Sequence, residues 1–280
     1  MYAEALPHMR CPACCGALRL SHPAHDAGRE IVGGALLCEG CGAAYPVRDG
    51  IADFLGPPRP PSLTQRINEL PAAAWVYERA WRPFALTLLA RQRFPYRREL
   101  PLMVALARPE RGGLFLDVAC SNGLYARALT RAARRSPGVP PLHVIGVDHA
   151  LPMLREARRL ARLAGLRITY VRAKAQALPV ASCAASGVTI GGSLNEIGDL
   201  DDCLAEVRRT LAPGGCFVAM TLMRAGTPAG RALQAGMRWA GVVFWTAEEL
   251  AGHFERHGLE TSHREQHGIV LFSLSVPHGA

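Results

Sequence analysis

Four cysteines near the start of the chain have the spacing of a metal site. They form two Cys-x-x-Cys pairs, Cys11 with Cys14 and Cys38 with Cys41. Four thiolates held in two such turns suit tetrahedral zinc, and the bound metal supplies folding free energy that a short segment lacks. The pattern therefore predicts a structural Zn²⁺ site. Three neighbouring side chains could replace one of these ligands: Cys15, His22 and His25.

The residues that follow the second pair carry a more specific signal. Residues 44–51, Ala-Tyr-Pro-Val-Arg-Asp-Gly-Ile, and the two cysteine pairs together resemble a zinc-ribbon family. That family includes the small activator subunit of tRNA, ribosomal RNA and protein methyltransferases, and similar ribbons precede ribosomal RNA guanine methyltransferases. The resemblance implies either help in binding RNA or shielding of a methyltransferase domain, and these residues do not choose between the two roles.

A second chemical signature lies between a predicted strand and a predicted helix. Residues 116–123, Leu-Asp-Val-Ala-Cys-Ser-Asn-Gly, resemble the first motif of class I methyltransferases, which bind S-adenosyl-L-methionine (SAM). Small residues let the backbone pass close to the cofactor, and the helix N-terminus faces its carboxylate. Gly123 is retained, whereas Ala119 and Ser121 stand where the family prefers glycine. With Asp117, these residues are candidates for cofactor binding.

Two further strand ends complete the candidate cofactor site. Asp148 stands at the family's acidic position, where a carboxylate accepts hydrogen bonds from both ribose hydroxyls. Residues 171–179 resemble the next motif, in which an aspartate accepts a hydrogen bond from the adenine amino group. Lys174 stands at that position and can only donate. Either the amide of Ala175 and another acceptor, such as Gln176, replace the aspartate, or the site is weakened. Alternatively, the lysine simply extends into solvent.

The region before the fifth predicted strand strengthens the resemblance. Residues 206–215 match the signature Glu-x-x-Arg-x-Leu-x-Pro-Gly-Gly, whose role is structural. The likeness covers residues 110–275 and implies a methyltransferase type 11-like enzyme, from a broad group that modifies small molecules, quinones and RNA. The ribbon together with residues 77–82 also resembles a group of uncharacterised plastid and bacterial methyltransferases.

The acceptor side of such a fold lies beyond the carboxyl ends of the strands. Asn195 and Glu196 lie there and are candidates to orient a substrate donor or accept its proton. Alternatively, Asn195 caps a turn and Glu196 pairs with an arginine, while His149 is expected to be a loop residue. No Asn/Asp-Pro-Pro-Tyr motif is present, which argues against the usual methyltransferases that modify amino groups of DNA, protein glutamine and some RNA. Six aromatic residues could line an apolar pocket or pack in the core: Trp75, Tyr77, Trp81, Trp239, Phe244 and Trp245.

Strands that alternate with helices must position these residues. The alternation predicts an α/β, Rossmann-like fold with a seven-stranded, mostly parallel sheet and helices on both faces. We expect a zinc ribbon at 1–55, a Pro-rich linker at 56–71 and a SAM-dependent methyltransferase domain at 72–280, in which 72–110 form a helical lid. Strands are predicted at 114–118, 143–147, 168–172, 186–191, 216–222, 260–264 and 269–276, and helices at 72–94, 124–135, 152–164, 201–211 and 246–257.

Composition and charge bound the remaining choices. Hydrophobic residues make up 49% of the chain and charged residues 20%, as in a globular protein. No apolar run is long enough to span a membrane and no secretory signal is present, so we expect a cytoplasmic protein with reduced thiols. The formal charge of +9, carried by arginine apart from Lys174, could attract RNA, an anionic small molecule or a membrane surface.

Three functions are consistent with these features. Methyl transfer from SAM to a small, partly apolar metabolite is favoured. The alternatives are an RNA methyltransferase and a catalytically degenerate fold that serves as a binding or scaffold subunit. We expect a small-molecule substrate, with RNA as the alternative partner. The sequence leaves the acceptor atom and the oligomeric state open.

Overall fold

The computed structural model describes residues 1–56, 94–135, 138, 140–239 and 241–279. Its strands are β1 (Leu18–His25), β2 (Ile31–Cys38), β3 (Ala44–Arg48), β4 (Ile51–Asp53), β5 (Gly113–Val118), β6 (Leu142–Asp148), β7 (Thr169–Arg172), β8 (Ala185–Gly191), β9 (Leu211–Leu222), β10 (Leu259–His267) and β11 (Val270–Pro277). They form one sheet in the order β1-β2-β3-β4-β7-β6-β5-β8-β9-β11-β10.

The part of the sheet from β7 to β10 has the predicted Rossmann-like arrangement. Strands β7, β6, β5, β8 and β9 are parallel, whereas β11 is antiparallel to both β9 and β10. Central strands read as continuous apolar runs because both of their faces are buried. In β5, Leu114 and Leu116 pack in one core layer and Phe115 packs in the other. The predicted seven strands are therefore confirmed as β5 to β11.

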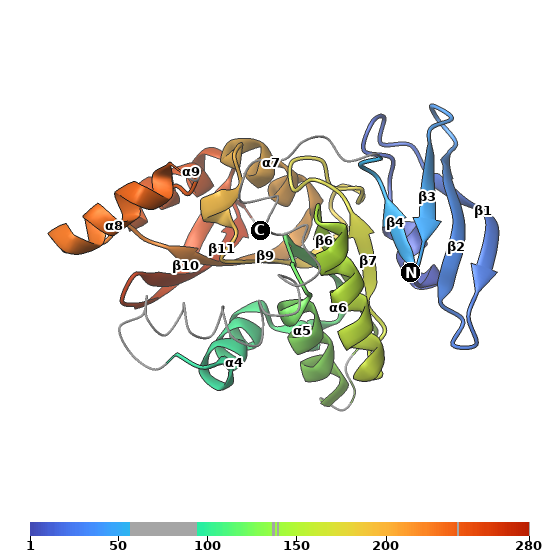
Figure 1. The fold of residues 1–280 in the computed structure, drawn as a ribbon, viewed down its shortest axis with the longest axis horizontal. Coiled ribbons are helices and arrows are strands. Elements are labelled where there is room, and N and C mark those ends of the chain that lie inside the picture. The colour runs from blue at the N-terminus through green and yellow to red at the C-terminus, as the bar shows by residue number, and fades with distance from the viewer. Residues whose placement is uncertain (57–93, 136–137, 139, 240, 280) are drawn as a thin grey trace.

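Helices cover both faces of this part (Figure 1). On one face lie α4 (Tyr96–Ala107), α5 (Leu124–Arg135) and α6 (Leu151–Leu163), whose apolar sides pack with Phe115. On the other lie α7 (Leu200–Thr210) and α9 (Ala247–Arg256). A capping box begins α9: the Thr246 side chain accepts from the Glu249 amide, and the Glu249 carboxylate accepts from the Thr246 amide.

The ribbon segment, residues 1–56, is joined to this fold by backbone pairing. A short 3₁₀ helix, η1 (Ala3–His8), precedes four antiparallel strands, and the last of these, β4, pairs in parallel with β7. Its end residue Asp53 lies opposite Arg172. The predicted linker lies outside the described residues from 57 onward, and the strands of the ribbon and of the methyltransferase part form a single sheet. The pairing covers the edge of β7, which would otherwise present open amides and carbonyls.

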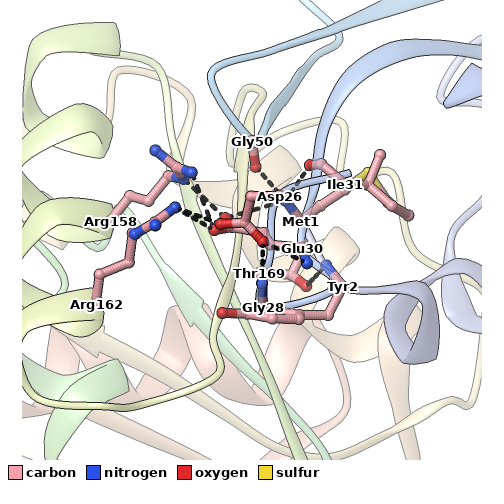
Figure 2. Close-up of polar contacts among 10 residues, drawn as sticks. All are labelled: Met1, Tyr2, Asp26, Gly28, Glu30, Ile31, Gly50, Arg158, Arg162 and Thr169. Carbon is pink, nitrogen blue, oxygen red and sulfur yellow. Dashed lines mark hydrogen bonds and ion pairs between the residues drawn. The ribbon is translucent and has the colours of Figure 1, made fainter. Parts of the chain in front are cut away.

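Ion pairs add to this backbone connection (Figure 2). Glu30 is 3% exposed, and its carboxylate accepts hydrogen bonds from Arg158 Nε at 2.7 Å and Arg162 Nη1 at 3.0 Å, both from α6. Asp26 accepts a second bond from Arg162 at 2.8 Å. The Tyr2 amide donates to Thr169 Oγ1 at 3.1 Å. Two of the many arginines in the sequence, Arg158 and Arg162, thus bind the ribbon to α6.

Several elements differ from the expectations or lie beyond them. An unpredicted helix, α8 (Pro228–Arg238), follows β9, and short 3₁₀ turns η3 (Pro109–Arg111) and η4 (Leu194–Glu196) also occur. Pro213, Gly214 and Gly215, which end the signature at 206–215, fall within β9, at an irregularity in its pairing with β8. The helix predicted at 72–94 and the linker from 57 onward lie outside the described residues, as do Trp75, Tyr77 and Trp81. No helix among the described residues is long and apolar enough to cross a bilayer.

Candidate functional site

The four predicted metal ligands converge at one end of the ribbon. The Sγ atoms of Cys11, Cys14, Cys38 and Cys41 all lie within 4.8 Å of one another. A side chain at Gly16 would place its Cβ 3.0 Å from Cys38 Sγ, so glycine leaves the space that the sulfurs need. Four close thiols with no other donor in the group suit tetrahedral zinc. The alternative ligands named from the sequence, Cys15, His22 and His25, are not part of this group.

The loop between β5 and α5 adopts the backbone conformation that glycines usually provide. Ala119 and Ser121 have φ angles of 52° and 50°, and Gly123 has a φ of 73°. Left-handed backbone costs a non-glycine residue about 1–2 kcal/mol. A Cβ at Gly123 would lie 2.6 Å from Tyr170 Oη, so this position also lacks room for a side chain. The loop therefore has the shape of the family motif, although two of its three positions carry side chains.

Asp148 holds this loop in place from the end of β6. Its Oδ2 accepts a hydrogen bond from the Ser121 amide, and its Oδ1 accepts one from the Ala150 amide, both at 2.8 Å. The residue is 7% exposed. Beside it, His149 Nδ1 lies 3.6 Å from Asp148 Oδ1, and His149 Nε2 is buried without a hydrogen-bond partner among the described residues. Such an orphaned ring nitrogen is a group that a bound ligand could satisfy.

Asp117 points into the protein rather than toward the open end of the sheet. Its carboxylate accepts from the Ala126 amide at 2.9 Å and from Thr189 Oγ1 at 3.1 Å. It thereby ties β5 to α5 and β8. Complete burial raises the pKa of Asp117 to about 7, and the negative charge of Asp148 adds to this rise. The contacts give Asp117 a supporting position beneath the loop.

Lys174 and Ala175 follow β7 on the neighbouring loop. The Ala173 amide donates to the Asp148 carbonyl at 3.0 Å, which places this loop next to the end of β6. Lys174 itself is exposed, and Ala175 and Gln176 are partly buried. An exposed lysine agrees with the alternative that its side chain extends into solvent.

Arg172 connects the ribbon with the candidate cofactor loop, a role that the sequence did not suggest. This arginine is 7% exposed. Its Nη1 lies 3.1 Å from Asp53 Oδ2 and donates to the Gly56 carbonyl at 2.9 Å, while its Nε donates to the His149 carbonyl at 3.0 Å. An arginine at a strand end is unremarkable in a sequence. Only the pairing of β4 with β7 shows that it links the two segments.

Asn195 occupies a different place from the one expected. It is 1% exposed, and its Nδ2 donates to the carbonyls of Leu222 and Val243 at 2.8 and 2.6 Å. Its Oδ1 accepts from the Leu222 amide at 2.8 Å. Because backbone groups use its donors and its oxygen, Asn195 fastens the end of β9 to the segment after α8, and these contacts do not support the prediction that it orients substrate.

Glu196 lies at the same end of the sheet and remains the better candidate for proton chemistry. The residue reaches the surface, but groups packed around its carboxylate desolvate it and raise its pKa above the usual range. Asp148 adds to the increase, and His149 opposes it. Glu196 makes no ion pair with an arginine in the described part of the chain, so the pairing alternative is not observed.

The aromatic residues after β9 divide into two groups. Phe244 and Trp245 are 7% and 8% exposed and pack among buried neighbours, whereas Trp239 is 96% exposed. The burial of Phe244 and Trp245 agrees with the alternative that these aromatic residues pack in the core.

Comparison with known proteins agrees with this geometry. A family described as "Methyltransferase domain" matches residues 115–215, and one described as "Trm112p-like protein" matches residues 6–50. An uncharacterised chloroplastic methyltransferase of Arabidopsis thaliana is 26% identical over 76% of this chain, and a demethylmenaquinone methyltransferase of Thermus thermophilus is 39% identical over 38% of it. The chain spans 61% and 45% of the lengths of these relatives.

A solved structure has a chain of similar fold. It is a complex between the Trm112 methyltransferase activator of Haloferax volcanii and a methyltransferase. It aligns with a TM-score of 0.57 and 14% identity, covering 76% of this chain and 97% of that one. This likeness supports the fold.

Proposed function

Since the chain is a SAM-dependent methyltransferase that carries a Trm112p-like zinc ribbon, we propose that it methylates a small, partly apolar acceptor. The observation that carries the proposal is the left-handed loop at residues 119–123, fastened by Asp148. Its small side chains and the orphaned His149 Nε2 fit a bound nucleoside cofactor. The similarity to a demethylmenaquinone methyltransferase supports an apolar acceptor.

Different residues of this chain would bind different parts of the cofactor. When bound, SAM supplies a methyl group already activated on a sulfonium. Ala119, Ser121 and Gly123 would leave room for it beside the backbone, and the amides at the start of α5 would bind its carboxylate. Asp148 keeps lone pairs for the ribose hydroxyls while its oxygens hold Ser121 and Ala150. We assign Asp117 to supporting the loop, and Lys174 and Ala175 to the adenine side.

Glu196 is proposed as the group that accepts the acceptor's proton. Groups packed around its carboxylate raise the pKa of Glu196, which makes it a stronger base than a glutamate with an ordinary pKa. The remaining catalytic effect is positional, because the acceptor atom, the methyl carbon and the sulfur must lie in line. Asn195 keeps the rim beside Glu196 rigid by fastening Leu222 and Val243.

The experiment combines SAM calorimetry with transfer of labelled methyl groups. Glu196→Gln should bind SAM as tightly as the natural protein and lose at least about tenfold in turnover with an apolar phenol or quinol acceptor. Glu248→Gln, an exposed acid at the start of α9, is the matched control and should keep full turnover. Failure of every apolar acceptor despite tight SAM binding would refute the acceptor class.

RNA is the second candidate acceptor. The observation that favours it is a group of exposed arginines at the end of α5: Arg131, Arg134 and Arg135. Total RNA is therefore included in the same assay. Label in RNA, with none in the apolar acceptors, would decide for this alternative.

A further inference from the structure

The segment between β9 and α9 has a composition and exposure that the methyl-transfer chemistry does not explain. From Met223 to Ala247 the chain has three arginines and no acidic residue. Trp239, at the end of α8, is 96% exposed, and Val243 is 45% exposed. An indole left almost wholly in water is unusual, because tryptophan is highly buried on average. Figure 1 shows α8 projecting from the body of the fold at the end opposite the ribbon.

This segment is nevertheless fixed at its base. Gln234 is 6% exposed, and its amide accepts from the Ala225 backbone at 2.8 Å and donates to the Met223 carbonyl at 3.0 Å. Met223 also forms a bridge with Trp245. The inner side of α8 is therefore held to the end of β9, so the exposure of Trp239 comes from a defined orientation of the helix.

The outer side of α8 is apolar and flanked by charge. Successive residues of a helix are 100° apart, which places Ala232, Ala235 and Trp239 opposite the buried side, and all three are exposed. Arg231 and Arg238, two turns apart, share one edge of this strip. Neither forms an ion pair with an acidic group in the described residues, whereas Arg224 is neutralised by Glu249 at 2.9 Å.

We propose that α8 docks on an anionic lipid surface, with Trp239 at the level of the headgroups. Tryptophan prefers the boundary between hydrocarbon and water, and arginines beside it are attracted to anionic lipids. The flat strip of alanines suits a lipid surface better than the pocketed contacts of a protein interface, where tryptophan fills a complementary cavity. The absence of acidic residues gives the segment the charge complementarity that such a surface requires.

The docked orientation has a consequence for the acceptor. Asn195, the residue before Glu196, donates a hydrogen bond to the carbonyl of Val243, which follows α8. Docking through α8 would therefore hold the rim of the acceptor site close to the lipid, where an apolar acceptor dissolves. This last step rests on the proposed function, whereas binding to lipid is measured without turnover and stands or fails independently.

The test is flotation of the full-length protein with vesicles of phosphatidylcholine, with and without phosphatidylglycerol. The natural protein should bind the anionic vesicles and release them as salt is raised. Arg231→Gln with Arg238→Gln should weaken binding about fivefold per arginine. Trp239→Ala should weaken it on the order of tenfold, because partial burial of the indole is lost.

Matched controls use exposed residues far from α8. Leu163→Ala removes another exposed apolar side chain, on α6, and Arg131→Gln with Arg135→Gln removes charge from α5; both should bind vesicles normally. SAM calorimetry on each variant checks that the fold is intact. The proposal is overturned if the natural protein ignores anionic vesicles, or if the controls lose as much binding. It is also overturned if Trp239→Ala changes only self-association, measured by sedimentation, because α8 would then contact a second copy.

Discussion

Arg172 and Asp53 face each other from neighbouring parallel strands, and their side chains meet 3.1 Å apart. The same arginine donates to the carbonyl of His149, the residue after Asp148. One buried guanidinium therefore fixes both the last strand of the zinc ribbon and the end of β6 that holds the candidate cofactor loop. The ribbon is connected to the loop through this contact as well as through the pairing of β4 with β7.

Replacing Arg172 by methionine should weaken SAM binding while the protein stays folded. The change keeps much of the side-chain volume but removes three hydrogen bonds, one of them to the backbone beside Asp148. Losing a hydrogen bond that involves a charged group costs about 1.5–3 kcal/mol. If half of this free energy is lost from SAM binding, the affinity falls about three- to tenfold. Calorimetric titration with SAM measures this loss of affinity. Arg155→Met, which removes an exposed pair with Asp49, should leave the affinity unchanged; an equal loss in both variants would contradict the connection.

Glycine at either left-handed loop position should stabilise the protein. Ala119→Gly and Ser121→Gly each relieve about 1–2 kcal/mol of backbone strain and add up to about 1 kcal/mol of unfolded-state entropy, which leaves a net gain of roughly 0.5–1 kcal/mol. Urea unfolding measures the change. Ala205→Gly, at an exposed position within α7, is the control and should destabilise by about 1 kcal/mol. Destabilisation by the loop variants would show that the positive φ angles carry no strain.

Zinc should be lost on mutation of a ligand but not of its neighbour. Cys14→Ser removes one of four converging thiols, whereas Cys15→Ser alters an adjacent exposed thiol outside the group. Zinc content by elemental analysis should fall only in the first variant, and its ribbon should become sensitive to proteolysis because metal binding supplies the folding free energy. Equal zinc loss in both would mean that Cys15 is a ligand.

Asp117 should make the stability of the protein fall as pH rises. Its folded pKa, about 7, exceeds the ordinary aspartate value of 3.8, so the folded state holds the proton more tightly than the unfolded state. The resulting stabilisation is complete below about pH 4 and is lost by about pH 7. Asp117→Asn should remove this pH dependence. In urea unfolding, the stability of the variant relative to that of the natural protein should therefore increase from about pH 4 to about pH 7. Parallel pH profiles would refute the raised pKa.

Lys174→Asp should tighten SAM binding, because it restores an acceptor for the adenine amino group. Lys174→Ala separates this effect from simple removal of a positive charge. We expect about a tenfold gain for aspartate over alanine, as for a hydrogen bond to a charged group. Calorimetry on the three proteins decides, and no difference between aspartate and alanine would mean that residue 174 does not face adenine.

Local patterns in the sequence were sufficient for most of the central fold. Three features depend only on residues that are close together in the sequence: the alternation of strands and helices, the paired cysteines and the loop at residues 116–123. They could therefore be recognised from the sequence. The contacts of Arg172 and the pairing of Ile51 with Tyr170 were not predictable, because they join segments that are distant in sequence and carry no local signature.

Two other features were missed for different physical reasons. Helix α8 contains two glycines, Gly230 and Gly236, which disfavour a helix interior, so its residues did not indicate a helix. Asn195 follows a strand end, as a substrate-binding residue would, and only the positions of Leu222 and Val243 show that the backbone uses its side chain.

The pairing of β4 with β7 also bears on how the protein is made. A ribosome releases the ribbon long before Thr169–Arg172 emerge, so β4 waits with an unpaired edge on the nascent chain. Such an edge invites contact with other chains, and the charged residues around β4, Arg48, Asp49 and Asp53, are the kind that discourage it. If zinc is scarce during translation, the ribbon would therefore not be folded when β7 emerges, and the edge of β7 would lack β4 as its partner strand.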